Sequence, residues 1–139
     1  NRRLAMLWGD KDTVQDPIGT TYDSSKQING TVKEQRRDKN SLFKHYQKLI
    51  KIRNAHPEIA RGKYTPIYFY DQEYFGGYLS TYNNSAVGIF HNVSMYPLTI
   101  DLLKYTEYDF KEIKNYSGEK ATLDNKILTI PGLTSVILK

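Results

Sequence analysis

Acidic side chains near the start of the chain are the first candidates for holding a metal ion. Asp10, Asp12, Asp16 and Asp23 carry carboxylates that could ligate calcium together with backbone carbonyls. Their spacing, however, lacks the alternating acidic loop and the distal glutamate of an EF-hand. Solvated loop carboxylates are therefore the favoured interpretation, and we assign no metal-binding residue to the chain.

The histidines and the lack of cysteine restrict the remaining site chemistry. His45, His56 and His91 form no H-E-x-x-H motif and no i, i+4 pair, so a structural role is favoured for each. Because the chain has no Cys, it cannot carry a disulfide framework, a Cys-ligated zinc ion, an iron–sulfur cluster or a Cys nucleophile. The sequence predicts no cofactor.

Tyrosine is unusually frequent, with 12 residues against five Phe and one Trp. An aromatic ring with a polar tip suits both half-exposed sheet faces and surfaces that bind sugars. Strand alternation places several tyrosines on common faces, namely Tyr68, Tyr70, Tyr74, Tyr78 and Tyr82. They could form a row of exposed rings for a saccharide, or they could pack across neighbouring strands. Packing is the favoured interpretation.

The net charge of +5 is concentrated in one segment. Residues 33–53 hold eight basic and two acidic side chains, which gives +6 for that segment. Lys44, Lys48 and Lys51 recur at helical spacing and could meet the phosphates of a nucleic acid. The chain lacks helix-turn-helix, zinc-finger and RNP-like patterns, so the solvated face of an amphipathic helix is favoured.

The elements that must position these residues start with a helix over residues 40–54. Its apolar positions recur at the i, i+4, i+7 spacing of one buried face, namely Leu42, Phe43, Tyr46, Leu49 and Ile50. Asp38, Asn40 or Ser41 can cap its start, and His56-Pro57 ends it. Before it, residues 1–35 have little periodicity and are typical of a loop.

After one further turn at Glu58–Arg61, the periodicity becomes that of short strands. The predicted strands are Tyr64–Tyr70, Tyr74–Tyr82, Ala86–Asn92, Tyr96–Asp101, Tyr108–Asn115, Ile127–Ile130 and Thr134–Leu138. Asn83-Asn84-Ser85 should close a hairpin. The expected fold is mainly β: an N-terminal loop and one amphipathic helix, followed by an antiparallel Greek-key-type β-sandwich. The boundary is expected at Gly62-Lys63.

Four segments carry a more specific pattern in a fixed order. Arg2–Trp8 is similar to an R-x-P-M-x-W segment, with Ala5 in place of the proline. Glu34–Tyr64 is similar to a Q…SL…YY.KLI.LR…P.L..G.Y stretch, and Ala86–Ser94 and Leu128–Leu138 to a "V…N.S" strand and a "viL" ending. Together they resemble the C-terminal part of the α-amylase family of glycoside hydrolases: the end of the catalytic barrel and the C-terminal sandwich.

The resemblance implies a fragment without the reaction centre. Residues 1–62 would be the last loop and helix of a (β/α)₈ barrel, and residues 63–139 the C-terminal all-β domain. The family's catalytic carboxylates come from barrel strands upstream of this chain, and none of its 15 acidic residues matches their motifs. A complete barrel needs about 250 residues. The chain is therefore expected to stabilise the barrel of a starch-degrading enzyme and to be inactive alone.

The resemblance also implies partners. The catalytic barrel of the parent enzyme is the expected partner, and Arg3 and Trp8 would lie in a loop on its catalytic face, where they could contact an α-glucan. Calcium is a cofactor that the parent could carry, with no site identifiable here. A secreted bacterial parent is favoured over a cytoplasmic one. If the barrel is absent, the helix face could support a homodimer; neither nucleic acid nor membrane is an expected partner.

Two other classes of function stay open at this point. A glucan-binding module would use surface Tyr and Trp8, and its binding should be saturable. A basic helix that binds nucleic acid or another anion would bind more weakly as the salt concentration rises. No apolar run approaches the roughly 18 residues that span a bilayer, and the mean hydropathy is −0.63.

Overall fold

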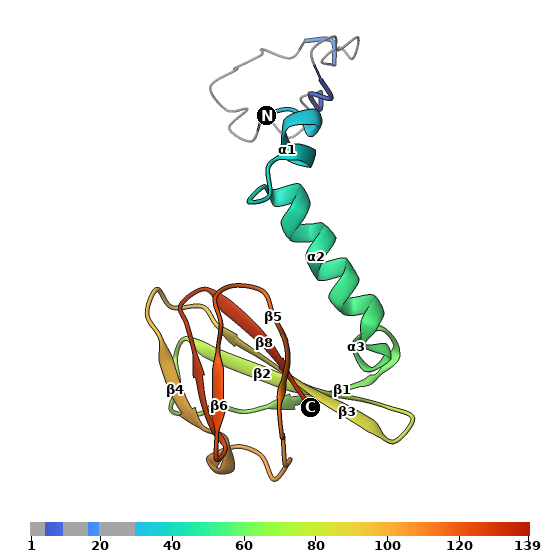
Figure 1. Ribbon diagram of the computed structural model, residues 1–139. Coiled ribbons are helices and arrows are strands. Elements are labelled where there is room, and N and C mark those ends of the chain that lie inside the picture. The colour runs from blue at the N-terminus through green and yellow to red at the C-terminus, as the bar shows by residue number, and fades with distance from the viewer. Residues whose placement is uncertain (1–4, 10–16, 20–29) are drawn as a thin grey trace. The chain divides into compact units, whose positions relative to one another are not determined.

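The computed structural model describes residues 5–9, 17–19 and 30–139 (Figure 1). Two compact units divide the chain, Asn1–Ile50 and Lys51–Lys139. This division falls before the boundary expected at Gly62-Lys63, because Ile52 and Ile59 pack against residues of the β-sheet. The assignment of residues 1–62 to a barrel and 63–139 to a sandwich domain stays a prediction about the intact protein.

The first unit contains a short helix that the sequence analysis did not predict, α1 (Val32–Arg37). Thr31 and Glu34 form a capping box: the Glu34 carboxylate accepts from the Thr31 N–H at 2.7 Å, and the Thr31 hydroxyl accepts from the Glu34 N–H at 3.2 Å. The helix has six residues and buries none of them. Local capping therefore defines it, and no apolar stripe marks it in the sequence.

The predicted amphipathic helix is present as α2 (Leu42–Ala55). Ser41 caps it: the Ser41 hydroxyl accepts from the Lys44 N–H at 3.2 Å and donates to the Gln35 carbonyl at 2.5 Å. The predicted further turn is a separate helix, α3 (Pro57–Arg61), which begins at a proline as helices often do.

In the described part of the chain, eight strands form two antiparallel sheets (Figure 1). Their bounds are β1 (Lys63–Ile67), β2 (Phe75–Tyr82), β3 (Ser85–Asn92), β4 (Leu98–Asp101), β5 (Ile113–Tyr116), β6 (Thr122–Asp124), β7 (Ile127–Ile130) and β8 (Thr134–Leu138). The first sheet has the order β1-β2-β3-β8-β5, and the second has the order β4-β7-β6. A 3-10 turn, η2 (Leu102–Lys104), follows β4. The mainly β sandwich of the sequence analysis is confirmed.

The core lies between the two sheets. Phe90, Val136 and Leu138 of the first sheet pack with Leu128 and Ile130 of the second, and all five side chains are fully buried. Phe90 also lies 5.6 Å from the Phe110 ring, edge to face. Side chains alternate along each strand, so the neighbours of Phe90 on β3 point to the opposite face of the sheet.

Two-residue turns set the register of two strand pairs. Asn83 and Asn84 have φ values of 47° and 60° and join β2 to β3, as predicted for this hairpin. Asn125 and Lys126, with φ values of 44° and 71°, join β6 to β7 in the same way. Left-handed backbone at both central residues is the type I′ geometry, whose twist matches that of the flanking strands.

A buried asparagine ties β3 to the far end of the sandwich. Asn92 is 1% exposed, and its amide donates to the carbonyls of Tyr96, Ile130 and Pro131 at 2.7, 3.0 and 3.0 Å. Its carbonyl accepts from the Ser94 N–H at 2.9 Å. The Ser94 hydroxyl lies 2.8 Å from the same oxygen, so both ends of the side-chain amide have partners, which offsets the cost of burying it.

Candidate functional site

Of the two residues predicted to contact sugar, Arg3 and Trp8, the structure describes Trp8. Arg3 lies outside the described residues. Trp8 is 57% exposed, and its backbone carbonyl accepts from the Lys33 N–H at 3.1 Å, next to the start of α1. The substrate-binding role of both residues stays a prediction.

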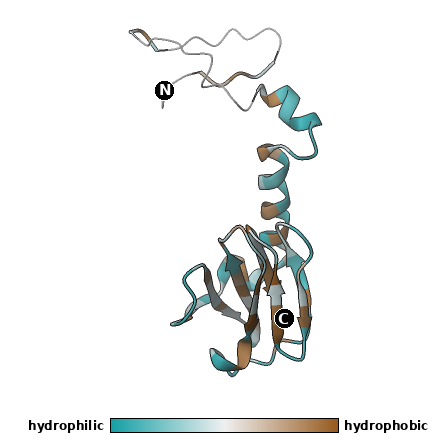
Figure 2. Ribbon diagram, turned by 90° about the vertical axis from the view of Figure 1, so that its left-hand side faces the viewer, coloured by the Kyte–Doolittle hydropathy of each residue, from teal (hydrophilic) through white to brown (hydrophobic). Residues whose placement is uncertain are grey.

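The apolar stripe of α2 is largely exposed. Exposure reaches 52% for Leu42, 59% for Tyr46 and 56% for Ile50, Phe43 is also exposed, and α2 has no buried residue. Figure 2 shows the stripe as brown segments between the polar turns of the helix. Covering such a face would contribute roughly 25 cal/mol of favourable free energy for each Å² of apolar surface removed from water.

A buried glutamate in α3 joins this helix to the first β-sheet. Glu58 of α3 is 3% exposed. Its Oε1 accepts from the Ser85 hydroxyl at 2.5 Å and from the Lys139 ammonium at 3.0 Å, while its backbone carbonyl accepts from the Ser80 hydroxyl at 2.5 Å. The Glu58 side chain thus ties α3 to the start of β3 and to the residue after β8, and its backbone carbonyl ties α3 to β2.

These contacts favour the ionised form of Glu58. The hydrogen bond from Ser85 is the main cause that lowers the pKa of the carboxyl from 4.5 to about 2; burial opposes the shift, and Lys139 adds to it. The other carboxylate oxygen, Oε2, is buried without a hydrogen-bond partner among the described residues. From the sequence, Glu58 was expected only to belong to a helical turn. No spacing rule marks its contact with Lys139, which lies 81 residues further along the chain.

The same face of the first sheet carries an aromatic pair. The Tyr64 and Tyr78 rings lie 4.8 Å apart, centroid to centroid, and Tyr78 packs with the apolar cluster of Val87, Ile89 and Ile137. Burial, with the nearby Tyr64, raises the pKa of the Tyr78 hydroxyl. This is the cross-strand packing that the sequence analysis favoured for the strand tyrosines.

The five predicted tyrosines do not form one row along a strand. Tyr78 and Tyr82 lie in β2, whereas Tyr68, Tyr70 and Tyr74 lie in the segment between β1 and β2 and are exposed. Tyr70 instead lies 5.6 Å from the ring of Tyr105, whose hydroxyl donates to Asp71. The role of these exposed rings in sugar binding stays a prediction.

The histidines have structural partners. His56 Nε2 lies 2.8 Å from the Asn115 amide nitrogen, and His91 Nδ1 lies 2.7 Å from the Ser135 hydroxyl. Burial lowers the pKa of His91. The His45 ring meets the Tyr46 ring edge to face. Within the described ranges no three His, Asp or Glu side chains gather as metal ligands do, and the candidate residues Asp10, Asp12, Asp16 and Asp23 lie outside those ranges.

The basic residues of α2 do not converge on one site. Lys44 donates to the Gln47 side chain at 3.3 Å and lies over the Phe43 ring, whereas Lys51 is exposed in the other unit. Arg53 and Arg61 line a pocket of about 410 Å³ together with Asn54, Pro57 and Ala60. Neither arginine pairs with an acidic side chain of the described part of the chain. In that part, no helix is long and apolar enough to cross a bilayer.

Sequence comparison finds relatives with one activity. The chain is 32% identical over 127 residues to the oligo-1,6-glucosidase of Parageobacillus thermoglucosidasius, which covers 87% of this chain and 22% of the relative. It is 36% identical over 91 residues to the oligo-1,6-glucosidase of Halalkalibacterium halodurans. This match covers 63% of the present chain and 16% of the relative. No protein-family model matches the chain. The chain therefore spans about a fifth of the length of these relatives.

Structure comparison finds the same fold in solved enzymes. Amy13B of Eubacterium rectale matches 99% of this chain and 27% of its own with a TM-score of 0.80 at 22% identity. The trehalulose synthase MutB of Pseudomonas mesoacidophila matches all of this chain and 25% of its own with a TM-score of 0.75 at 19% identity. At these identities the likeness establishes the fold alone.

Proposed function

Because the chain corresponds in sequence and in fold to the C-terminal part of an α-amylase-family glycoside hydrolase, we propose that it serves as the structural C-terminal region of an α-glucan-hydrolysing enzyme. Its task is to dock on the catalytic barrel and to stabilise it, while the chemistry is supplied by residues outside this chain. Retaining glycosidases need two carboxyl groups about 5–5.5 Å apart, and we assign no catalytic role to any residue here.

The observation that carries this proposal is the exposed apolar stripe of α2. Leu42, Tyr46 and Ile50 are each more than half exposed on a single helix face. Such a face is covered in a stable protein. The relatives extend well beyond the part that this chain matches, so the remainder of the same polypeptide is the proposed occupant.

Two unpaired cations support the same arrangement. Arg53 and Arg61 line one pocket without an acidic partner in the described part of the chain. Planar guanidinium groups suit carboxylates or carbonyls on an opposing protein surface. We propose that the missing barrel supplies those acceptors, which makes a nucleic acid unnecessary to explain the charge.

Charge on the stripe should therefore destabilise the full-length protein. Replacing Tyr46 and Ile50 with Asp buries two carboxylates at the proposed interface and should lower the free energy of unfolding by about 3 kcal/mol or more. The measurement is thermal unfolding of the full-length protein. Lys44→Asp with Lys51→Asp, which puts two carboxylates on the lysine face in place of two ammonium groups, is the control on the opposite face and should change the melting temperature little. Equal losses in both variants would contradict the proposal.

The 139-residue chain alone should release no reducing sugar from soluble starch or from isomaltooligosaccharides. The reason is that none of its 15 acidic residues matches the catalytic motifs of the family, whose two reacting carboxyl groups lie about 5–5.5 Å apart. The assay compares the pure chain with the full-length protein at equal concentration. Activity that co-purifies with the chain through two orthogonal columns would overturn the structural role.

We also propose the substrate, the metal ion and the cellular location of the full-length enzyme. The full-length enzyme is proposed to act on α-glucans or maltooligosaccharides, and Arg3 and Trp8 to reach that substrate. Calcium stays a proposal for the parent enzyme, as does secretion by a bacterium. A homodimer through the α2 stripe is the alternative occupant when the barrel is absent. Sedimentation of the isolated chain at high concentration tests it, and a monomeric mass would exclude it.

A further inference from the structure

A pocket at the tip of the β2–β3 hairpin is lined by uncharged polar side chains. It is an open surface depression of about 240 Å³ and lies within the second unit. Its residues carry hydroxyl, phenol or amide groups and no charge: Thr81, Tyr82, Asn83, Asn84, Ser85 and Tyr108. In a chain of net charge +5, such a lining disfavours both anions and cations as ligands.

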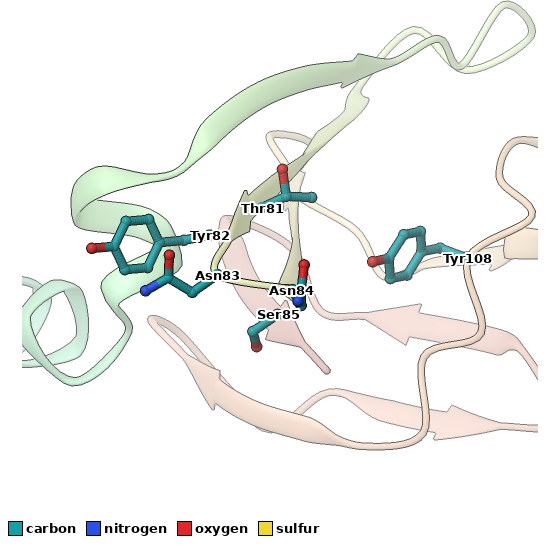
Figure 3. Close-up of a pocket in the computed structure, with 6 residues that line it drawn as sticks. All are labelled: Thr81, Tyr82, Asn83, Asn84, Ser85 and Tyr108. Atoms are coloured by element: carbon teal, nitrogen blue, oxygen red, sulfur yellow. The ribbon is translucent and has the colours of Figure 1, made fainter.

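Several polar groups of the pocket are available to a ligand. Asn83 and Asn84 are exposed, and neither side-chain amide hydrogen-bonds to a residue that the structure describes. Figure 3 shows the Tyr108 ring opposite the hairpin tip, with its hydroxyl directed toward Asn84. Tyr108 is 42% exposed. The pocket therefore offers an aromatic ring and an amide that both donates and accepts.

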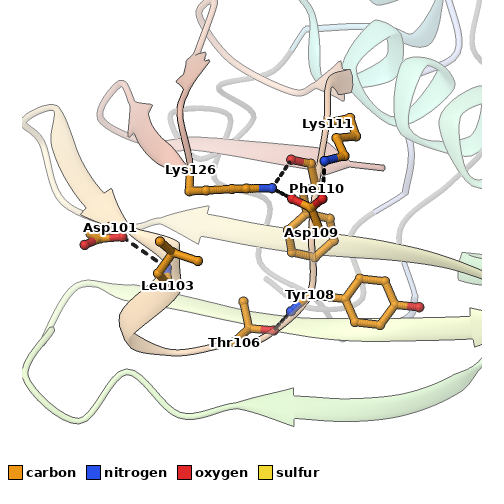
Figure 4. A network of polar contacts seen from close by, with 8 residues as sticks. All are labelled: Asp101, Leu103, Thr106, Tyr108, Asp109, Phe110, Lys111 and Lys126. Atoms are coloured by element: carbon orange, nitrogen blue, oxygen red, sulfur yellow. Dashed lines mark hydrogen bonds and ion pairs between the residues drawn. The ribbon is translucent and has the colours of Figure 1, made fainter.

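Both walls of the pocket are held in place. The type I′ turn fixes Asn83 and Asn84. On the other side, the Tyr108 N–H donates to the Thr106 hydroxyl at 3.1 Å, and its ring lies 5.5 Å from the buried ring of Phe110. Lys126 pairs with Asp109 and donates to the Phe110 carbonyl at 3.3 Å (Figure 4). The Tyr108 wall therefore loses little side-chain entropy when a ligand binds, whereas the turn fixes Asn83 and Asn84 at the backbone only.

From this lining we propose that the hairpin pocket binds a neutral oligosaccharide. Sugars present C–H faces that stack on aromatic rings and hydroxyls that pair with amides and phenols. Tyr108 supplies the stacking ring, and the Asn84 amide and Thr81 hydroxyl supply the hydrogen bonds. The proposal rests on residues of the second unit and does not require the proposed docking of α2.

The test is a titration of the ¹⁵N-labelled 139-residue chain with maltoheptaose, followed by amide NMR. Saturable shifts should be confined to residues 81–85 and 106–110. Asn84→Gly should weaken binding at least about fivefold because one hydrogen-bonding amide is lost, and Tyr108→Ala should weaken it as much or more. Glycine adopts the left-handed backbone of position 84 without strain, so this variant keeps its fold.

The chain offers a matched control at its other type I′ turn. Asn125→Gly makes the same substitution at a left-handed asparagine outside the pocket, and its affinity for maltoheptaose should equal that of the wild type. Because no charge lines the pocket, the affinity should also be insensitive to salt. Absence of saturable shifts, shifts centred on Tyr68–Tyr74, or equal losses in both glycine variants would each overturn the proposal.

Discussion

Glu58→Gln should lower the free energy of unfolding of the chain by about 3 kcal/mol. Gln mimics the protonated carboxyl, and a pKa lowered from 4.5 to about 2 means that the fold prefers the ionised form by about that amount. The measurement is urea unfolding at neutral pH. Glu112→Gln is the matched control, because Glu112 is exposed and, among the described residues, its carboxylate pairs with Lys114 alone; it should cost less than about 0.5 kcal/mol.

The pH dependence provides a second test of the same charge. A carboxyl whose pKa is depressed in the fold contributes stability that is full above its unfolded pKa and is lost as the pH falls through its folded pKa. The contribution of Glu58 should thus be complete above pH 4.5 and vanish by about pH 2. The difference between wild type and Glu58→Gln should shrink over that range, and a difference constant with pH would argue against an ionised Glu58.

Local patterns were enough to predict most of the elements. The spacing of Leu42, Tyr46 and Ile50 predicted α2, and β7 and β8 have the predicted bounds. The hairpin was predicted because the turn residues Asn83-Asn84-Ser85 separate two strand-like runs. In the structure Asn83 and Asn84 alone form the turn, and Ser85 begins β3. These features depend on residues close together in the chain, and that is the information a single sequence carries.

Three features were missed for physical reasons. The helix α1 and the strand β6 are too short to show a period, with six and three residues. The roles of Glu58 and Asn92 depend on partners up to 81 residues away, such as Lys139. Their burial follows from how the sheets and α3 come together, and nothing in the neighbouring sequence distinguishes a buried, paired glutamate from a solvated one.

The candidate site residues stay a prediction, unlike the fold. Arg3 lies outside the described residues, Trp8 is exposed, and Tyr68 and Tyr78 lie in different segments. The hairpin pocket combines Asn84 with Tyr108, which are separated in the chain by β3, β4 and η2 and were not linked by any motif. A surface pocket of this kind depends on which loops meet at one end of a sandwich, so strand periodicity gives no indication of it.

Gly88→Ala should destabilise the chain by about 3 kcal/mol, at the upper end of the range for overpacked cores. A Cβ at position 88 would lie 2.5 Å from Phe110 Cζ and 2.6 Å from Phe90 Cε2. Both rings belong to buried side chains, with 3% and 0% exposure, so neither can move away without disturbing the core. The glycine therefore provides the space in which the two rings meet edge to face.

Gly76→Ala on β2 is the matched control for this substitution. A Cβ at Gly76 would meet nothing within 4 Å, so the variant should be neutral or slightly stabilising, because alanine restricts the unfolded chain more than glycine does. Urea unfolding of both variants measures the difference. Phe110→Leu, combined with Gly88→Ala, should recover part of the loss, since the two changes share one space and their effects should not add. If Gly88→Ala proved as harmless as Gly76→Ala, the aromatic core could not be packed against the backbone of β3 as the structure has it.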